Sequence, residues 1–228
     1  MVKKVISIAV ALLVGVGLGW HFKPPARLDV RAETDGPEPE TVRSEPPNAS
    51  QQPKDVLLRS INAKPPKPAT PSDEAVERGE QLVLENQHAE AIQRFDDAIR
   101  LDPKNGLAYA GRAGSKEALG SMSEAERDYN RAAICYQFAY KAGDPVAMRH
   151  LGDCFYAGKG VGVSKVKSMI LYRLAAHSGD IEAHVNWGFC LFYGHGVQQD
   201  FVEAAELFRM ASDAGSPRGM YYTLRGQE

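Results

Sequence analysis

The clearest candidate for a chemical site in this sequence is Gly158–Lys165, which reads GKGVGVSK. A phosphate-binding loop needs closely spaced glycines, which let backbone N–H groups approach the phosphates, and a lysine followed by serine or threonine. Lys159 is followed by glycine instead, and the upstream glycine spacing is different. We therefore interpret these glycines as turn residues and expect no nucleotide to bind here.

Histidine and cysteine side chains are the next candidates, because they can bind metal ions. His150 and Cys154 lie four residues apart on one helix face, and His184 with Cys190 could supply further ligands. The three cysteines of the chain, however, lack the CxxC and Cys/His spacings of zinc sites. We expect Cys154 and Cys190 to be buried apolar residues, and we predict neither a metal nor another cofactor.

Motifs and composition argue against catalysis and against nucleic-acid binding. The chain contains no HExxH or GxSxG signature and no paired-carboxylate signature, so we predict that it is not an enzyme. Its 228 residues carry a net charge of −2, whereas a nucleic-acid-binding surface is strongly basic. A hydrophobic content of 43% allows a core held by ordinary apolar packing.

The first 22 residues contain an apolar segment. Residues 5–22 are uncharged if His21 is counted as neutral, and 18 helical residues span about 27 Å against a hydrocarbon core of about 30 Å. We predict that residues 1–22 are an uncleaved signal anchor that contacts the membrane through residues 5–22. A cleaved signal peptide is the alternative, because Gly17 and Gly19 offer a small-x-small cleavage site.

The charges that flank this segment bear on its orientation. They nearly balance, but a short positive segment ahead of a first apolar run ordinarily stays in the cytoplasm. The sequence therefore predicts a single-pass membrane protein with an extracytoplasmic (periplasmic) C-terminal domain, or a secreted protein if the leader is cleaved. Gly15 and Gly19 form a GxxxG pair whose helix face could hold a homodimer.

Residues 23–71 are rich in proline. They hold 11 of the 14 prolines of the chain and no aromatic residue. Such a composition cannot bury enough apolar surface to fold. We predict a disordered linker that acts as an extended tether.

Internal repeats organise the rest of the chain. Residues 150–180 align with residues 186–216 at a shift of 36. The alignment pairs glycine or alanine at 152/188, 158/194, 160/196, 175/211 and 179/215. Apolar residues at helical spacing predict that each unit is a helical hairpin, with small residues where helices approach closely or the chain turns.

The motif LGxxFxxGxGV at Leu151–Val161, with a weaker copy at Trp187–Val197, resembles the Sel-one-like repeat of helical solenoid proteins. Upstream, residues 72–105 and a degenerate copy after them resemble tetratricopeptide units. These resemblances imply an all-α fold, a right-handed α-solenoid of antiparallel helix pairs. The predicted domains are tetratricopeptide-like repeats at 72–142 and Sel-one-like repeats with a capping helix at 143–228.

Two segments are predicted to join and to finish this stack. Residues 123–142 contain neither proline nor glycine and fit the registers of both repeat types. We expect one helix of about 20 residues there, which closes the upstream pair and opens the downstream stack. Residues 217–225 repeat the start of a further unit, so we expect a capping helix.

The resemblances imply a protein–protein interaction scaffold that binds a peptide or a partner protein on the concave face, which the first helices of successive pairs line. A structural spacer in an envelope complex is the alternative. Phe189 and Phe192 could equally be core residues between repeats, and Val76 and Glu80 differ from the residues with which chaperone-binding tetratricopeptide domains hold a terminal carboxylate. The expected lining residues are Glu80, Val83, Glu117, Arg149, Asp153, Tyr156, Val185, Phe189, Phe192 and Tyr221.

Overall fold

The computed structural model describes residues 69–225, apart from the side chain of Arg225. The predicted anchor, the Gly15/Gly19 helix face and nearly all of the predicted linker lie outside the described residues. Within the described part, no helix is both long enough and apolar enough to cross a membrane.

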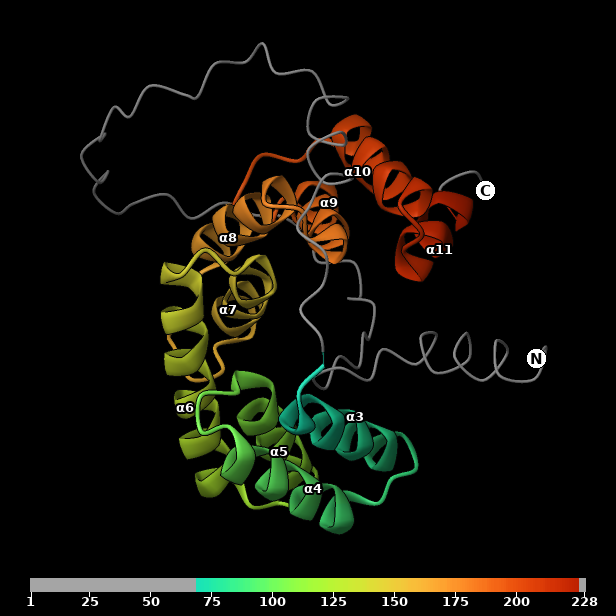
Figure 1. Ribbon diagram of the computed structural model, residues 1–228. Helices are drawn as coiled ribbons and strands as arrows, with labels where there is room; N and C mark the ends of the chain where they lie inside the picture. Colours follow the sequence, from blue (N-terminus) through green and yellow to red (C-terminus); the bar gives the residue numbers. More distant parts are fainter. Residues whose placement is uncertain (1–68, 226–228) are drawn as a thin grey trace, which may run out of the picture.

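The described residues form a stack of antiparallel helix pairs, which confirms the predicted all-α solenoid. The stack curves into an arc, with α3, α5, α7, α9 and α11 along its inner side and α4, α6, α8 and α10 along its outer side (Figure 1). The helices are α3 (Pro71–Leu84), α4 (His88–Leu101), α5 (Gly106–Ala118), α6 (Met122–Lys141), α7 (Pro145–Ala157), α8 (Lys165–His177), α9 (Ile181–Tyr193), α10 (Phe201–Asp213) and α11 (Pro217–Arg225).

Short polar side chains fix where most of these helices begin. At α3, the Thr70 hydroxyl accepts a hydrogen bond from the Asp73 N–H, and the Asp73 carboxylate accepts one from the Thr70 N–H. The carboxylates of Asp144 and Asp180 accept hydrogen bonds from the first N–H groups of α7 and α9. These groups otherwise lack partners inside a helix, so the caps stabilise each start.

Glycines bring the two helices of a pair together. A Cβ atom at Gly152 would lie 2.7 Å from the Tyr172 ring, and one at Gly188 would lie 2.8 Å from the Phe208 ring. The prediction that helices approach closely at these two glycines is confirmed. The sequence alignment predicted the small residue but not its partner, an aromatic ring of the second helix that packs directly on the glycine backbone.

The glycines between the two helices of a Sel-one-like unit have two different roles. Gly158 ends α7 with a positive φ of 74°, as expected for a turn glycine. Gly160 also has a positive φ, and a side chain there would overlap the backbone carbonyl of Tyr129 on α6. Gly196 meets Lys165 of α8 in the same way. Each loop therefore packs on the second helix of the preceding pair.

The predicted helix at the junction is confirmed. α6 is a single helix of 20 residues that packs against α5 and also against α7. One core cluster includes Tyr109 of α5, Tyr136 of α6, Leu151 of α7 and Leu171 of α8. The upstream and downstream pairs therefore share a continuous core through α6.

Candidate interaction surface

The helices on the inner side of the arc carry all ten predicted lining residues, but the structure gives these residues different environments. Glu80 on α3 is exposed, as are Phe192 on α9 and Tyr221 on α11. Val83 and Phe189 are partly buried and pack against core clusters. Phe189 thus follows the alternative interpretation, a core residue between repeats.

Val185 does not line the surface, so its prediction as a partner-binding residue is wrong. Its side chain has 0% exposure and belongs to the core cluster that contains Phe208. Arg149 occupies the equivalent position of the preceding repeat, and its polar side chain remains partly accessible. The repeat register gives Val185 and Arg149 equivalent positions, but the apolar side chain of Val185 lies in the core.

Arg149 and Asp153 tie repeats together. The Arg149 guanidinium donates to the Asp180 carboxylate at 2.9 Å, across the boundary between α7 and α9. Burial would lower the pKa of Arg149, but the Asp180 and Asp153 carboxylates outweigh it and raise that pKa. Asp153 accepts hydrogen bonds from the Tyr172 hydroxyl at 2.8 Å and from the Asn186 amide at 3.3 Å.

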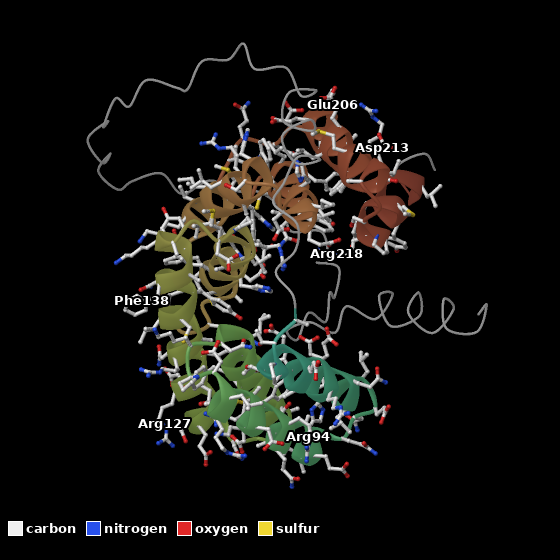
Figure 2. All side chains as sticks on the ribbon, viewed as in Figure 1. Arg94, Arg127, Phe138, Glu206, Asp213 and Arg218 are labelled. Carbon is white, nitrogen blue, oxygen red and sulfur yellow. The ribbon has the colours of Figure 1, made fainter. Side chains whose placement is uncertain are left out.

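The same network continues to the last helix. Arg218 of α11 donates to the Glu182 carboxylate at 3.2 Å and to the Asn186 side-chain oxygen at 2.9 Å. Figure 2 labels Arg218 on the side of α11 that faces the interior of the arc. The polar residues of α7, α9 and α11 on this side are therefore largely paired with one another and hold three successive units in register.

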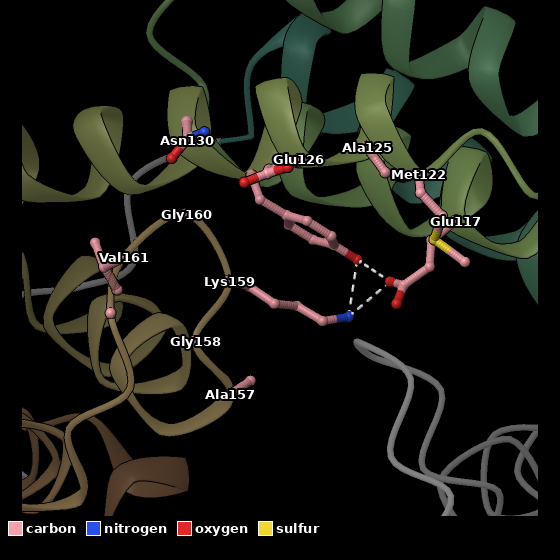
Figure 3. Close-up of a pocket in the computed structure, with 12 residues that line it drawn as sticks. Glu117, Met122, Ala125, Glu126, Asn130, Ala157, Gly158, Lys159, Gly160 and Val161 are labelled. Atoms are coloured by element: carbon pink, nitrogen blue, oxygen red, sulfur yellow. Dashed lines mark hydrogen bonds and ion pairs between the residues drawn. The ribbon is translucent and has the colours of Figure 1, made fainter.

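A pocket of about 630 Å³ lies where the loop after α7 meets α6 (Figure 3). The Lys159 ammonium donates to Glu117 at 2.9 Å and to the Tyr129 hydroxyl at 2.8 Å, and that hydroxyl donates to Glu117 at 2.6 Å. The pocket is lined by Glu117, Met122, Ala125, Glu126, Tyr129, Asn130 and residues 157–162.

The charges and hydrogen bonds among Glu117, Tyr129 and Lys159 favour a structural role over a catalytic one. Burial would raise the pKa of Glu117, but hydrogen bonds from Tyr129 and Lys159 outweigh it and lower that pKa. Burial and the Glu117 carboxylate raise the pKa of Tyr129, so this phenol stays protonated. Sequence reasoning placed Glu117 on the surface and missed its partners, because Lys159 lies 42 residues away along the chain.

The next unit repeats this junction with different side chains. The Tyr156 hydroxyl lies 2.7 Å from Nδ1 of His195, which stands where the preceding unit has Lys159. The Lys165 ammonium donates to the Tyr156 carbonyl and lies over the Tyr156 ring, 3.0 Å from its centroid. Tyr156, predicted to line the binding face, is thus a contact between two repeats.

The histidines and cysteines of the described residues do not converge on a metal site. The prediction that Cys154 and Cys190 are buried is confirmed, and burial raises the pKa of each thiol to about 12. His184 is also buried, 2% exposed, and burial lowers its pKa. Within residues 69–225, no three His, Cys, Asp or Glu residues form a group that could hold a metal ion.

Aromatic rings gather where α9 ends and α10 begins. Phe192 packs edge-on against Phe201 and Tyr193, with ring centroids 5.2 and 4.9 Å apart. Phe201 is 55% exposed, and the neighbouring Val202 is 72% exposed. Sequence reasoning selected Phe192 from the repeat register but missed Phe201, which lies outside the first helices.

Solved structures and curated relatives resemble parts of this chain. A Sel1 repeat protein from Oxalobacter formigenes is 25% identical, with 54% of this chain and 91% of that chain covered and a TM-score of 0.37. A protective antigen of uropathogenic Escherichia coli that displays an SLR fold is 24% identical, with 71% and 33% covered and a TM-score of 0.38.

The curated relatives are much longer proteins. Hsp70-Hsp90 organizing protein 1 of Glycine max is 29% identical over 107 residues, which are 47% of this chain and 18% of the relative. The Hsp70-Hsp90 organizing protein of Triticum aestivum is 35% identical over 57 residues, which are 25% of this chain and 10% of the relative. The chain therefore spans less than a fifth of the length of these two relatives.

The model of the Sel1 repeat family matches residues 118–144, 145–180 and 181–216. The second and third matches contain the pairs α7/α8 and α9/α10, and the first contains α6 and the turn that follows it. This first match begins upstream of residue 143, where the Sel-one-like region was predicted to start. The predicted resemblance to the Sel-one-like repeat is confirmed: residues 118–216 of the chain consist of Sel1 repeats.

Proposed function

We propose that this protein is a non-catalytic scaffold that binds an extended segment of a partner protein on the inner side of its arc. The observation that carries the proposal is the arrangement of α3, α5, α7, α9 and α11, which line that side along the whole described chain (Figure 1). Solenoids use such extended concave surfaces for recognition. The Sel1 repeats support this class of function.

The accessible side chains of these helices favour a segment with basic and apolar residues. Glu80 on α3 offers an exposed carboxylate, and Tyr221 on α11 is 38% exposed, whereas the Glu117 carboxylate is already paired with Lys159 and Tyr129. A cationic side chain would be attracted to the Glu80 carboxylate and can also stack on an aromatic ring. An anionic chain terminus fits less well, because Val76 is buried and Glu80 is negative. The names of the two curated relatives therefore do not determine the partner of this chain.

Site-specific photo-crosslinking in cells tests the inner-side proposal. A photoreactive amino acid replaces Glu80 or Tyr221 on the inner helices. As matched controls, the same amino acid replaces Arg127 or Glu206 on the outer helices (Figure 2). We expect the two inner positions to crosslink to one common partner and the outer positions to give little of that product. Equal crosslinking from the outer positions would contradict an inner binding face.

We also propose that residues 5–22 tether the scaffold to a membrane, with the repeats outside the cytoplasm. The proposal rests on the uncharged run of residues and on the lysines that precede it. The full-length protein should remain in the membrane fraction after an alkaline wash, and a reporter fused after Glu228 should report an extracytoplasmic location. A mature protein that begins at Trp20 would show cleavage and secretion instead.

A further inference from the structure

We propose that the C-terminal end of the described solenoid docks an amphipathic helix of a partner protein. The surface, called the end face here, consists of exposed apolar side chains from three helices. The end face lies at one end of the arc rather than along its inner side, so it is a second interaction surface, although Phe192 also belongs to the predicted lining residues. Its residues are Phe192, Phe201, Val202, Met220 and Leu224.

The first observation concerns where each loop packs. The Gly160 loop packs on the backbone of residues 129–130, and the Gly196 loop packs on the backbone of residues 165–166, which is 36 residues further along. The next equivalent position is Phe201 and Val202. These two side chains are 55% and 72% exposed. In the two preceding units this position is covered by a loop. Among the described residues, no loop covers it at Phe201 and Val202.

The second observation concerns the pair of side chains beside that position. In the preceding unit, Tyr156 and Lys165 pack on each other, and His195 of the next loop bonds to Tyr156. The equivalent residues are Phe192 and Phe201, whose rings pack edge-on with centroids 5.2 Å apart. Phe192 is 40% exposed. The C-terminal unit thus replaces a polar pair with two phenylalanines and leaves both accessible.

The third observation concerns α11. Met148 and His184 are equivalent positions of α7 and α9 and are 9% and 2% exposed, whereas Met220 of α11 is 44% exposed. Leu224, which is the equivalent of Gly152 and Gly188 in the repeat alignment, is 68% exposed. Met148 and Gly152 of α7 pack against α8, and Gly188 of α9 packs against α10. In α11 the equivalent positions present apolar side chains to solvent.

The first described helix, α3, has a different composition on its exposed side. The exposed residues of α3, apart from Pro71 and Leu84, are charged or polar. A polar outer face is the usual property of a terminal repeat and keeps a solenoid soluble. A helix is present where the capping helix was predicted, as α11, but its exposed Met220 and Leu224 do not give it the polar outer face of a cap.

Leu224 determines which helix can dock. In the complete units the second helix places a ring, Tyr172 or Phe208, on the glycine backbone of the first helix. A leucine fills that space, so the docking helix must have a small residue opposite Leu224 and apolar residues against Met220 and Phe201. The second helices α8 and α10 of another copy of this chain carry the rings. A partner protein fits the end face better than a second copy.

A peptide that copies residues 194–213 with Phe208→Ala is a suitable probe, because it contains the loop, the second helix and a small residue in place of the ring. Labelled at one end, it is titrated with the full-length protein and followed by fluorescence anisotropy. We expect saturable binding that Leu224→Glu and Phe201→Ser each weaken at least about tenfold. The same peptide with Phe208 retained should bind more weakly than the probe.

Phe138→Ser is the matched control, because Phe138 is 69% exposed on the outer side of α6, far from the end face in the arc (Figure 2). It should leave binding unchanged, and circular dichroism should give the same helix content for all variants. No saturable binding, or equal binding by wild type and Leu224→Glu, would overturn the proposal. A wild-type dimer that Leu224→Glu converts to a monomer would also overturn it, because a second copy would then occupy the end face.

Discussion

The rings of Tyr172 and Phe208 pack against two glycines of the facing helices. Tyr172 lies against Gly152, and Phe208 lies against Gly188. Tyr172 cannot move away easily, because it is 3% exposed and its hydroxyl is bonded to Asp153. We predict that Gly152→Ala lowers the free energy of unfolding by about 1–3 kcal/mol, the usual effect of overpacking. Urea unfolding followed by circular dichroism measures the change.

Gly114→Ala is the control for this substitution. Gly114 also lies inside a helix, but the nearest atom to an added Cβ would be the Tyr129 hydroxyl oxygen at 3.7 Å. Alanine stabilises a helix interior by about 0.5–1 kcal/mol relative to glycine. Gly114→Ala should therefore leave stability unchanged or raise it. A Gly152→Ala variant as stable as Gly114→Ala would show that the ring has room to shift.

The buried His184 predicts a dependence of stability on pH. Burial lowers the pKa of His184, although Asp180 nearby favours the protonated form. In the unfolded chain the side chain takes up a proton near pH 6.5, and in the folded chain it does so only at lower pH. The free energy of unfolding is therefore highest above pH 6.5 and falls as the pH drops below it, by at most about 1.4 kcal/mol per pH unit for one proton.

His184→Met removes the imidazole that takes up this proton. The free energy of unfolding should therefore depend less on pH between about pH 6.5 and 5. Methionine is the suitable replacement, because Met148 and Met220 occupy the equivalent positions of the neighbouring units. Part of the dependence should remain, since burial and Lys165 also lower the pKa of His195. Thermal midpoints of the two proteins that decline equally over this range would contradict the assignment to His184.

The loop–helix contacts that join successive pairs can be tested at Gly160. A Cβ there would overlap the Tyr129 backbone, which is part of α6 and cannot rotate away as a side chain can. Gly143 has a positive φ of 83°, but a Cβ at this glycine would meet no atom within 4 Å, so it isolates the effect of backbone conformation. Alanine in a left-handed conformation costs about 1–2 kcal/mol.

We therefore predict that Gly160→Ala destabilises the protein more than Gly143→Ala does, by about 1 kcal/mol or more. Denaturant unfolding of the two variants under the same conditions gives the difference. Equal losses would mean that the loop can move away from α6. In that case the second glycine of each loop would serve the turn alone.

The helix pairs and the long α6 were predictable from sequence, because periodic apolar residues, glycine stops and N-terminal caps act locally. The packing of Gly160 on Tyr129 could not be predicted from sequence, because only the three-dimensional stack brings residues of adjacent units together. The lining residues were predictable only in part. The register fixes a helix face, but whether Val185 turns into the core or Arg149 pairs with Asp180 depends on neighbouring repeats.

On the scale of the whole molecule, the core cluster that runs from α5 to α8 predicts that the upstream and downstream pairs unfold together. We expect residues 69–228, expressed without the preceding segment, to form a helical monomer with a single unfolding transition. Trp187 is the only tryptophan of this fragment, so its fluorescence reports on α9, whereas circular dichroism reports on all helices.

The two signals should give the same urea midpoint, as a two-state transition requires. Leu151→Ala, which removes a side chain that is 3% exposed in the shared core, should lower both midpoints together, because such a cavity costs about 2–5 kcal/mol. A fluorescence transition that separates from the circular dichroism transition would mean that α6 joins two independent units. The nearest-neighbour contacts through α6 would then be too weak to couple the upstream and Sel1 repeats.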